Sequence, residues 1–383
     1  MMLATGIVDL ATLMQALRLL WRPFISITAI MLTTAVAQKV GILDRMAARI
    51  EPLTRGPVHR AFAAVFALSA LTSALLNNDA AVLLLTPLIV ALVKRLYPLR
   101  QYLVVPFAFA VFAAAGVAPL VISNPMNLVV AERRGIGFNE YAVWMAPVSV
   151  VGWIIAFFIL RRFFRAQLDD DIPARGPERE PLPPMEPGGR RVILLLGVVL
   201  LAYPIITFFD GPVWAVAAAG AALALLVYRL HHPLTIPDLR ASISWDVLPF
   251  LFGVFVIATG LENVGAVRLL SRLYGSLHGG PQLFLVGIVA SLGSALLNNH
   301  PMAILNALAL EQVPGSGKRE VLAALIGGDL GPRLLPMGSL AGLLWLESLR
   351  RQKVEISLRQ FVRIGALVTV PTLIASLLLL LIR

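Results

Sequence analysis

The residues best suited to chemistry in this chain form a polar turn inside apolar sequence. The turn consists of three adjacent side chains, Asn77, Asn78 and Asp79. It recurs in the second half, where Ser294–Asn299 repeats the residues Ser73–Asn78 and is followed by His300. Polar groups are costly in hydrocarbon, and buried polar turns in matching places of two halves indicate the substrate site of a secondary transporter.

Three titratable side chains are candidates for carrying a proton. Asp79 is the strongest, because an intramembrane carboxylate that has lost its water can trade its proton for a substrate; its alternative role is to cap the helix that follows. Asp329 is the second, and its alternative is a structural ion pair with Arg333 one turn later. His300 takes the position that matches Asp79, and a histidine there is either a proton carrier or a hydrogen-bonded core residue.

Amide and hydroxyl side chains can bind a neutral hydroxylated solute, or offer carbonyl oxygens to Na⁺. At the two turns the amides are Asn77, Asn78, Asn298 and Asn299. At two later helix breaks the polar residues are Ser123, Asn124, Asn127 and Ser339. Their alternative role is to satisfy backbone groups that turns and breaks leave free, and we expect both uses. Together with Asp79 these side chains form the predicted substrate site.

The composition is that of an integral membrane protein. Hydrophobic residues make up 58% of the chain and charged residues 14%, and the mean hydropathy is +0.84. Long apolar runs without the period-2 alternation of barrel strands predict membrane-spanning helices. The first residues lack the features of a cleaved signal peptide.

The cysteine count and the net charge limit which ligands and partners are possible. The chain contains no cysteine, so disulfides and thiolate metal sites are excluded, and a soft metalloid would meet only oxygen and nitrogen groups. The net charge of +11 is spread over several loops, which favours anionic membrane lipid and not nucleic acid as the partner. Phosphate-binding loops and the HExxH, CxxC and GxSxG motifs do not occur, which disfavours an enzyme. We expect no catalytic residue, no metal site and no cofactor.

Two hairpins and two interrupted helices position the polar residues. A first span is expected over residues 23–40, and the basic ends of residues 60–94 favour a re-entrant hairpin with the polar turn at its tip. Gly and Pro break the helices expected at residues 102–130 and around residues 327–339. Residues 192–209 and 212–228 are two further spans without a counterpart in the first half.

Loop charges predict the topology. Counting crossings places residues 161–191, 229–245 and 350–363 in the cytoplasm, and each of these loops holds more basic than acidic residues. The same count places the ends of the second hairpin outside. We therefore predict an all-α membrane protein with two inverted-topology repeats, each with a re-entrant helical hairpin and a broken transmembrane helix. The repeats cover residues 1–165 and 191–383, and residues 166–190 form a cytoplasmic linker.

Several segments resemble the ArsB-type arsenite permeases of the ion transporter superfamily. They are Asn78-Asp79-Ala80-Ala81 ending in Thr86-Pro87, Ser123-Asn124 with Asn127, Asn139-Glu140-Tyr141 and, most specifically, the stretch from Gly328 to Leu346. The resemblance covers about residues 10–380. It implies a multi-pass protein of the bacterial inner membrane that exports As(III) and Sb(III), as neutral trihydroxides, in exchange for protons.

Three features depart from that family pattern. The internal repeat and the family both predict two more N-terminal spans than the chain carries. The first broken helix has no acidic residue near Ala114, and His300-Pro301-Met302 stands where Met-Pro-Thr is usual. The last two differences concern the proton path and the substrate.

Two other transport functions fit the same scaffold. A Na⁺/H⁺ antiporter or small-anion carrier would respond to Na⁺ or to a carboxylate, and a passive metalloid channel would ignore a pH gradient. The sequence leaves open the coupling stoichiometry, whether a soluble ATPase docks on the protein, and whether the protein is a monomer or a homodimer.

Overall fold

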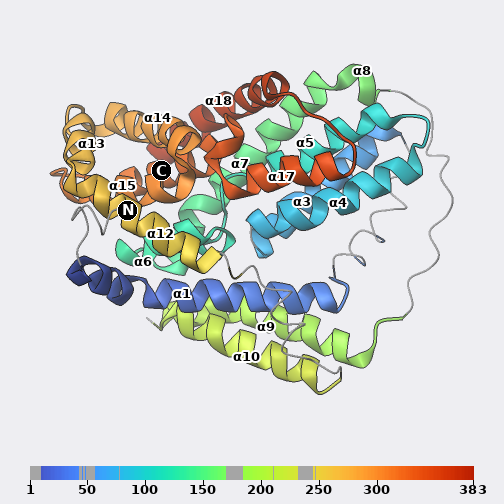
Figure 1. Cartoon of the computed structure of the whole chain (residues 1–383), viewed down its shortest axis with the longest axis horizontal. Coiled ribbons are helices and arrows are strands. Elements are labelled where there is room, and N and C mark those ends of the chain that lie inside the picture. Colours follow the sequence, from blue (N-terminus) through green and yellow to red (C-terminus); the bar gives the residue numbers. More distant parts are fainter. Residues whose placement is uncertain are drawn as a thin grey trace.

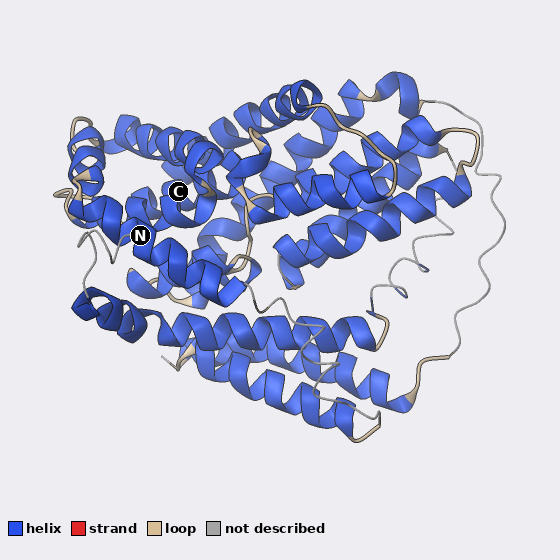
Figure 2. Ribbon diagram, viewed as in Figure 1, coloured by secondary structure: helices blue, strands red, loops and turns tan. Residues whose placement is uncertain are grey.

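The computed structural model describes residues 10–42, 57–76, 78–169, 184–209, 211–231 and 247–383, together with residues 45, 48 and 245. Within these ranges the side chains of residues 10–20, 79–80, 247, 250–251 and 254–255 are not described. Every regular element in the described part is helical (Figure 2), which confirms the all-α prediction.

The first half opens with a long helix, α1 (Leu10–Lys39). It begins before residue 23, where we expected the first span to start, and Pro23 lies inside it. The helix continues through Pro23 because only one backbone bond is lost there and neighbouring helices tolerate such sites in membranes. The following elements are α3 (Val58–Leu75), α4 (Asn78–Leu96), η1 (Gln101–Leu103), α5 (Val104–Ala114), η2 (Val121–Ser123), α6 (Pro125–Arg133), α7 (Phe138–Phe163) and α8 (Arg165–Leu168).

The second half repeats this order after two extra helices. The extra pair is α9 (Pro187–Phe208) and α10 (Val213–Arg229). The remaining elements are α12 (Val247–Asn263), α13 (Ala266–Tyr274), α14 (Gly279–Leu297), α15 (Asn299–Glu311), α16 (Lys318–Leu330), η3 (Gly331–Arg333), η4 (Pro336–Gly338), α17 (Leu340–Arg351) and α18 (Leu358–Ile382). The predicted hairpins are therefore α3–α4 and α14–α15, and both predicted helix breaks are present.

The helices form a main body and a flanking layer (Figure 1). In the layer, drawn along the lower edge of the figure, α10 packs against both α1 and α9. In the body, each hairpin packs against a half-helix of the other half of the chain, α4 against α17 and α15 against α6. The two halves are interlocked by these crossed contacts.

An aromatic cluster strengthens one of the contacts between the halves. Phe112 of α5 stacks on Trp345 of α17 with ring centroids 4.7 Å apart, and Phe109 and Phe361 meet the same indole edge-on. Trp345 is fully buried. Each such pair adds about 0.5–1.5 kcal/mol beyond simple burial, so the cluster holds α5 and α17 in a fixed relation.

Glycines allow the second helix break, between α16 and α17, to pack closely against α14 and α18. A Cβ atom at Gly327 or Gly331 would overlap backbone atoms of α14. Small residues at this spacing let helix backbones approach closely in membranes. Gly365 on α18 meets the backbone carbonyl of Arg333 in the same way. The segment from α16 through η3 is therefore positioned by backbone contacts.

Five helices in the described part are long and apolar enough to cross a membrane, namely α3, α7, α9, α14 and α18. Large apolar side chains on α7 and α9 point outward, among them Val150 and Phe158 on α7 and Leu201 on α9. This is the surface that a multi-pass membrane protein presents to lipid. In contrast, α15 has 13 residues, fewer than the ~20 of a full crossing, whereas its partner in the hairpin, α14, is long enough to cross.

Candidate substrate site

A small cavity lies where the two hairpins and the two broken helices meet. Its volume is about 30 Å³, enough for roughly two water molecules. The polar part of its wall comprises Asn78, Asn124, Asn299, Asp329, Arg333 and Ser339, and the apolar part comprises Val82, Phe112, Ala115, Pro332 and Ala341. Both halves of the chain thus contribute to one polar site.

Four helices begin at this cavity. Asn78 and Asn299 are the first residues of α4 and α15. Asn124 and Ser339 are the N-caps of α6 and α17, and their side-chain oxygens accept hydrogen bonds from the first turns. A helix N-terminus carries about half a positive charge, so each of these ends favours an electron-rich oxygen nearby. The helix breaks and hairpin tips therefore make the site attractive to oxygen atoms.

The tip of the first hairpin is tied to the first helix break. The Oδ1 atom of Asn78 accepts a hydrogen bond from the Ser73 hydroxyl, and its Nδ2 donates to the carbonyl of Gly116 at 3.0 Å. The Ser123 hydroxyl donates to the carbonyl of Ala74 at 2.7 Å. These bonds satisfy backbone groups freed by the turn and the break.

The tip of the second hairpin turns through Asn298. This residue has a positive φ of 82°, and its Oδ1 accepts from the backbone N–H of His300 at 3.2 Å. With ψ at 145°, this backbone lies outside the left-handed helical region that Asn tolerates and close to one used mainly by Gly, so the turn is strained. The Nδ1 atom of His300 lies 2.6 Å from the Oδ1 of Asn299. The buried imidazole thus supports Asn299 from behind and does not line the cavity.

Asp329 connects the second broken helix to the first. Its Oδ1 accepts from the Nδ2 of Asn124 at 2.7 Å. Its Oδ2 accepts from the Nδ2 of Asn127 at 3.0 Å and from the backbone N–H of Ala118 at 2.9 Å. Asn127 also donates to the Tyr141 hydroxyl at 2.8 Å. The carboxylate of one break therefore binds the donors that the other break leaves free.

Arg333 makes the reciprocal contact. Its Nη2 donates to the carbonyl of Ala113, near the C-terminal end of α5, where the helix dipole favours a cation. Gly116 is needed here because a Cβ atom would overlap the guanidinium. The Nε and Nη1 atoms of this buried side chain have no hydrogen-bond partner. A cation with unused donors thus stands in the cavity wall.

The arsenical pump membrane protein family matches the chain over residues 1–383. This chain belongs to that family. It is 28% identical to the arsenical pump membrane proteins of Escherichia coli K12 and of Yersinia enterocolitica, covering in each case 98% of this chain and 89% of the relative. It is 27% identical to a 46 kDa membrane protein of Mycobacterium leprae, over 91% of this chain and 83% of that protein.

A solved structure shows the same fold. The crystal structure of the YdaH transporter from Alcanivorax borkumensis has a TM-score of 0.64 and 13% sequence identity to this arsenical pump family protein. The match covers 98% of this chain and 89% of YdaH. Together with the apolar helices, the family identifies a multi-pass membrane transporter related to arsenic.

The structure of this pump family protein separates the predicted site residues into two groups. The first group lines the cavity and consists of Asn78, Asn124, Asn299, Asp329 and Ser339. The second lies behind it and bonds backbone or other side chains, and it consists of Ser123, Asn127, Asn298 and His300. Asn77 and the side chain of Asp79, including its alternative role as a helix cap, lie outside the described residues.

The sequence did not predict the role of Arg333. We had considered it only as a structural partner for Asp329, but both side chains make their hydrogen bonds to the first broken helix. The signal available was an arginine placed inside a Gly-Pro helix break, far from either membrane surface. Within the described residues, no group of three or more His, Asp or Glu side chains is arranged to hold a metal ion.

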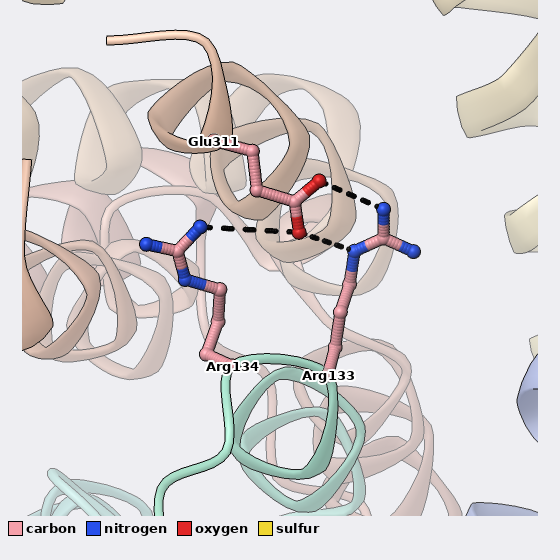
Figure 3. Close-up of polar contacts among 3 residues, drawn as sticks. All are labelled: Arg133, Arg134 and Glu311. Atoms are coloured by element: carbon pink, nitrogen blue, oxygen red, sulfur yellow. Dashed lines mark hydrogen bonds and ion pairs between the residues drawn. The ribbon is translucent and has the colours of Figure 1, made fainter. Parts of the chain in front are cut away.

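Away from the cavity, ion pairs join α15 and α16 of the second half to α6 and α7 of the first half. Arg133, at the end of α6, donates to both carboxylate oxygens of Glu311, at the end of α15, at 2.8 and 2.9 Å (Figure 3). Arg134 lies 3.9 Å from the same carboxylate. The Nζ of Lys318 lies 2.5 Å from the Oε1 of Glu140. The second hairpin is therefore held to the first half by the ion pairs of Glu311 at its base.

Proposed function

We propose that this protein exports arsenite and antimonite, as neutral trihydroxides, in exchange for protons across the bacterial inner membrane. The observation that carries the proposal is the meeting of both hairpins and both helix breaks at one small polar cavity. A trihydroxide offers three hydroxyl groups that both donate and accept hydrogen bonds. Amides, a serine hydroxyl and a carboxylate–guanidinium pair provide the complementary set. The family match supports an arsenical as the substrate.

The order of the elements supports the proposed inverted repeats. Each half contains a hairpin followed by a broken helix, α3–α4 with α5–α6 and α14–α15 with α16–α17. The crossed packing of α4 on α17 and of α15 on α6 is the arrangement that two related halves would make. We propose residues 1–165 and 191–383 as the repeats and residues 166–190 as their linker.

We propose Asp79 and Asp329 as the proton carriers. Asp329 accepts three hydrogen bonds from the first broken helix. A protonated carboxyl group is a weaker hydrogen-bond acceptor than a carboxylate, so these three bonds would weaken when the proton arrives. Protonation would therefore loosen the contact between the two broken helices, which links proton binding to a change in the shape of the cavity.

The proton gradient is large enough for this task. One proton entering under ~100 mV contributes ~2.3 kcal/mol. Because ~1.4 kcal/mol corresponds to a tenfold ratio, voltage alone supports a roughly 50-fold accumulation per proton. A pH gradient adds to this value.

The proposal is tested by growth and by transport. Expression in a bacterium without arsenite transporters should restore growth on arsenite and antimonite. Purified protein in liposomes, without any ATPase, should accumulate arsenite in the lumen only when an outward proton gradient, with an acidic lumen, is imposed. Stimulation by Na⁺ or by a carboxylate would favour the antiporter or small-anion carrier. Flux that ignores the pH gradient would favour a passive channel.

Two variants separate the proton carriers from structural residues. Asp79→Asn and Asp329→Asn should each permit slow downhill exchange of arsenite but stop accumulation driven by a pH gradient. If the Asp79→Asn protein still accumulates arsenite at the normal rate, Asp79 is a helix cap. Asp329 would then be the sole carrier of this proposal.

A further inference from the structure

We infer that the cavity also binds small inorganic oxyanions, and that Arg333 is the anchor for their oxygen atoms. The inference rests on the proposed function in one respect, because it places the substrate in the same cavity. It adds a ligand class that the neutral-hydroxide mechanism does not require.

The first argument is the state of the guanidinium. Arg333 is 4% exposed, and its Nε and Nη1 atoms have no hydrogen-bond partner, while only Nη2 is used, on the carbonyl of Ala113. Leaving donors of a buried charged group unpaired is costly. The oxygens of Asp329 already bind Asn124, Asn127 and Ala118. Asp329 therefore does not take up the unused donors of Arg333, and the oxygen of a ligand that reached them would pair them.

The second argument is the electrostatic field that the cavity wall produces. The charges of Arg333 and ionised Asp329 cancel, and what remains is the partial positive charge of four helix N-termini, each about half an elementary charge. The Ser339 hydroxyl oxygen accepts from the N–H of Gly342 at 3.0 Å, so its own hydrogen is left to donate toward the cavity. A ligand that supplies only acceptors and carries one negative charge therefore also matches this wall.

The third argument is size. The small volume of the cavity, about 30 Å³, favours a compact ion with three oxygens around one central atom over phosphate esters and dicarboxylates. Nitrate has this shape, has no hydrogen-bond donor, and does not bind protons near neutral pH. It is therefore a probe for the oxyanion subsite that cannot act as a proton carrier itself.

The experiment uses the full-length protein in lipid nanodiscs. Sodium nitrate should raise the thermal midpoint of the wild type, compared with sodium chloride at the same ionic strength, and should displace radiolabelled arsenite. In Arg333→Gln, nitrate affinity should fall by about 10- to 100-fold, because charge-assisted hydrogen bonds are lost. Arg333→Lys, which keeps the charge without the guanidinium geometry, should retain part of the response.

Matched measurements keep the inference open to refutation. Arg133→Gln removes an arginine away from the cavity and should respond to nitrate as the wild type does. If Arg333→Gln does not fold, Arg333→Lys and Ser339→Ala must each weaken the nitrate response. An Arg333 variant with wild-type nitrate affinity, or a wild type that treats nitrate and chloride alike, overturns the inference. A wild type stabilised by nitrate that binds no arsenite would instead contradict the proposed function.

Discussion

The two broken helices meet at the same cavity but contribute different chemistry. The first contains only neutral polar side chains, Asn124 and Asn127, at its break, whereas the second contains Asp329 and Arg333. Both charged groups bind the first helix, the carboxylate to its donors and the guanidinium to a carbonyl. The charged side chains of the second half thus pair with polar groups that the break in the first half leaves free. A change at one break should therefore affect both halves.

The hairpin tips differ in a related way. In the first hairpin Ser73 donates to the side chain of Asn78. In the second the matching Ser294 hydroxyl is buried without a hydrogen-bond partner, and Asn299 meets His300 instead. The same six-residue sequence has therefore produced one closed polar network and one open one. In the second copy the next residue is His300, and its ring takes the side-chain oxygen of Asn299 as a partner.

The largest effect is expected from Asp329→Ala. The substitution leaves three donors of the first broken helix without this acceptor and removes the negative charge that interacts with Arg333, which should destabilise the protein by about 3–5 kcal/mol. Thermal unfolding in nanodiscs measures this. Asp329→Asn keeps the volume and one acceptor, so its loss should be about 1–3 kcal/mol. Equal midpoints for the alanine variant and the wild type would show that the two breaks are independent.

The next effect is expected from Gly365→Ala. Its Cβ atom would overlap the backbone carbonyl of Arg333, so the second break must move. Overpacking of this kind costs about 1–3 kcal/mol. Gly197→Ala in α9 is the control, since a Cβ atom there meets no neighbour and should stabilise its helix by up to ~1 kcal/mol. Arsenite binding and thermal midpoints should fall together in Gly365→Ala only.

A smaller loss of stability should distinguish the two hairpin tips. Ser73→Ala breaks the bond to Asn78 and should cost about 1 kcal/mol. It should also weaken arsenite binding, since Asn78 lines the cavity. Ser294→Ala removes a hydroxyl that has no partner, so its stability should be unchanged or slightly higher. Equal losses in both variants would mean that the two tips have the same hydrogen-bond networks.

Much of the fold could be predicted from local sequence. Apolar runs long enough to span a bilayer, together with Gly and Pro at the breaks, placed the hairpins and interrupted helices because these signals depend on nearby residues. The helix α1 contains the span expected over residues 23–40 almost entirely and begins before it, since a membrane helix can pass through Pro23. The duplication itself was visible as the repeated residues Ser294–Asn299.

The site could be predicted only in outline. The polar types at the turns indicated which residues can reach the cavity, and Asn78, Asn124 and Asn299 do so. Their partners depend on how the halves cross, and no local pattern encodes that crossing. For this reason Arg333 was assigned to Asp329, four residues away, when its hydrogen bond goes to Ala113 in the other half of the chain. His300 likewise supports a neighbour and does not line the cavity.

The smallest effect is expected at the base of the second hairpin, where Glu311 pairs with Arg133 between α15 and α6. Glu311→Gln should cost no more than ~1 kcal/mol, because the pair is partly exposed and screened by salt. Glu347→Gln is the control, since it breaks a pair with Arg351 inside α17 alone. Both variants lose one negative charge, but only Glu311→Gln releases the second hairpin from the first half. Amide hydrogen exchange in α15 should therefore become faster in Glu311→Gln and stay unchanged in Glu347→Gln. Exchange that is equally fast in both variants would assign the effect to net charge, and the packing of α15 on α6 alone would then hold the hairpin.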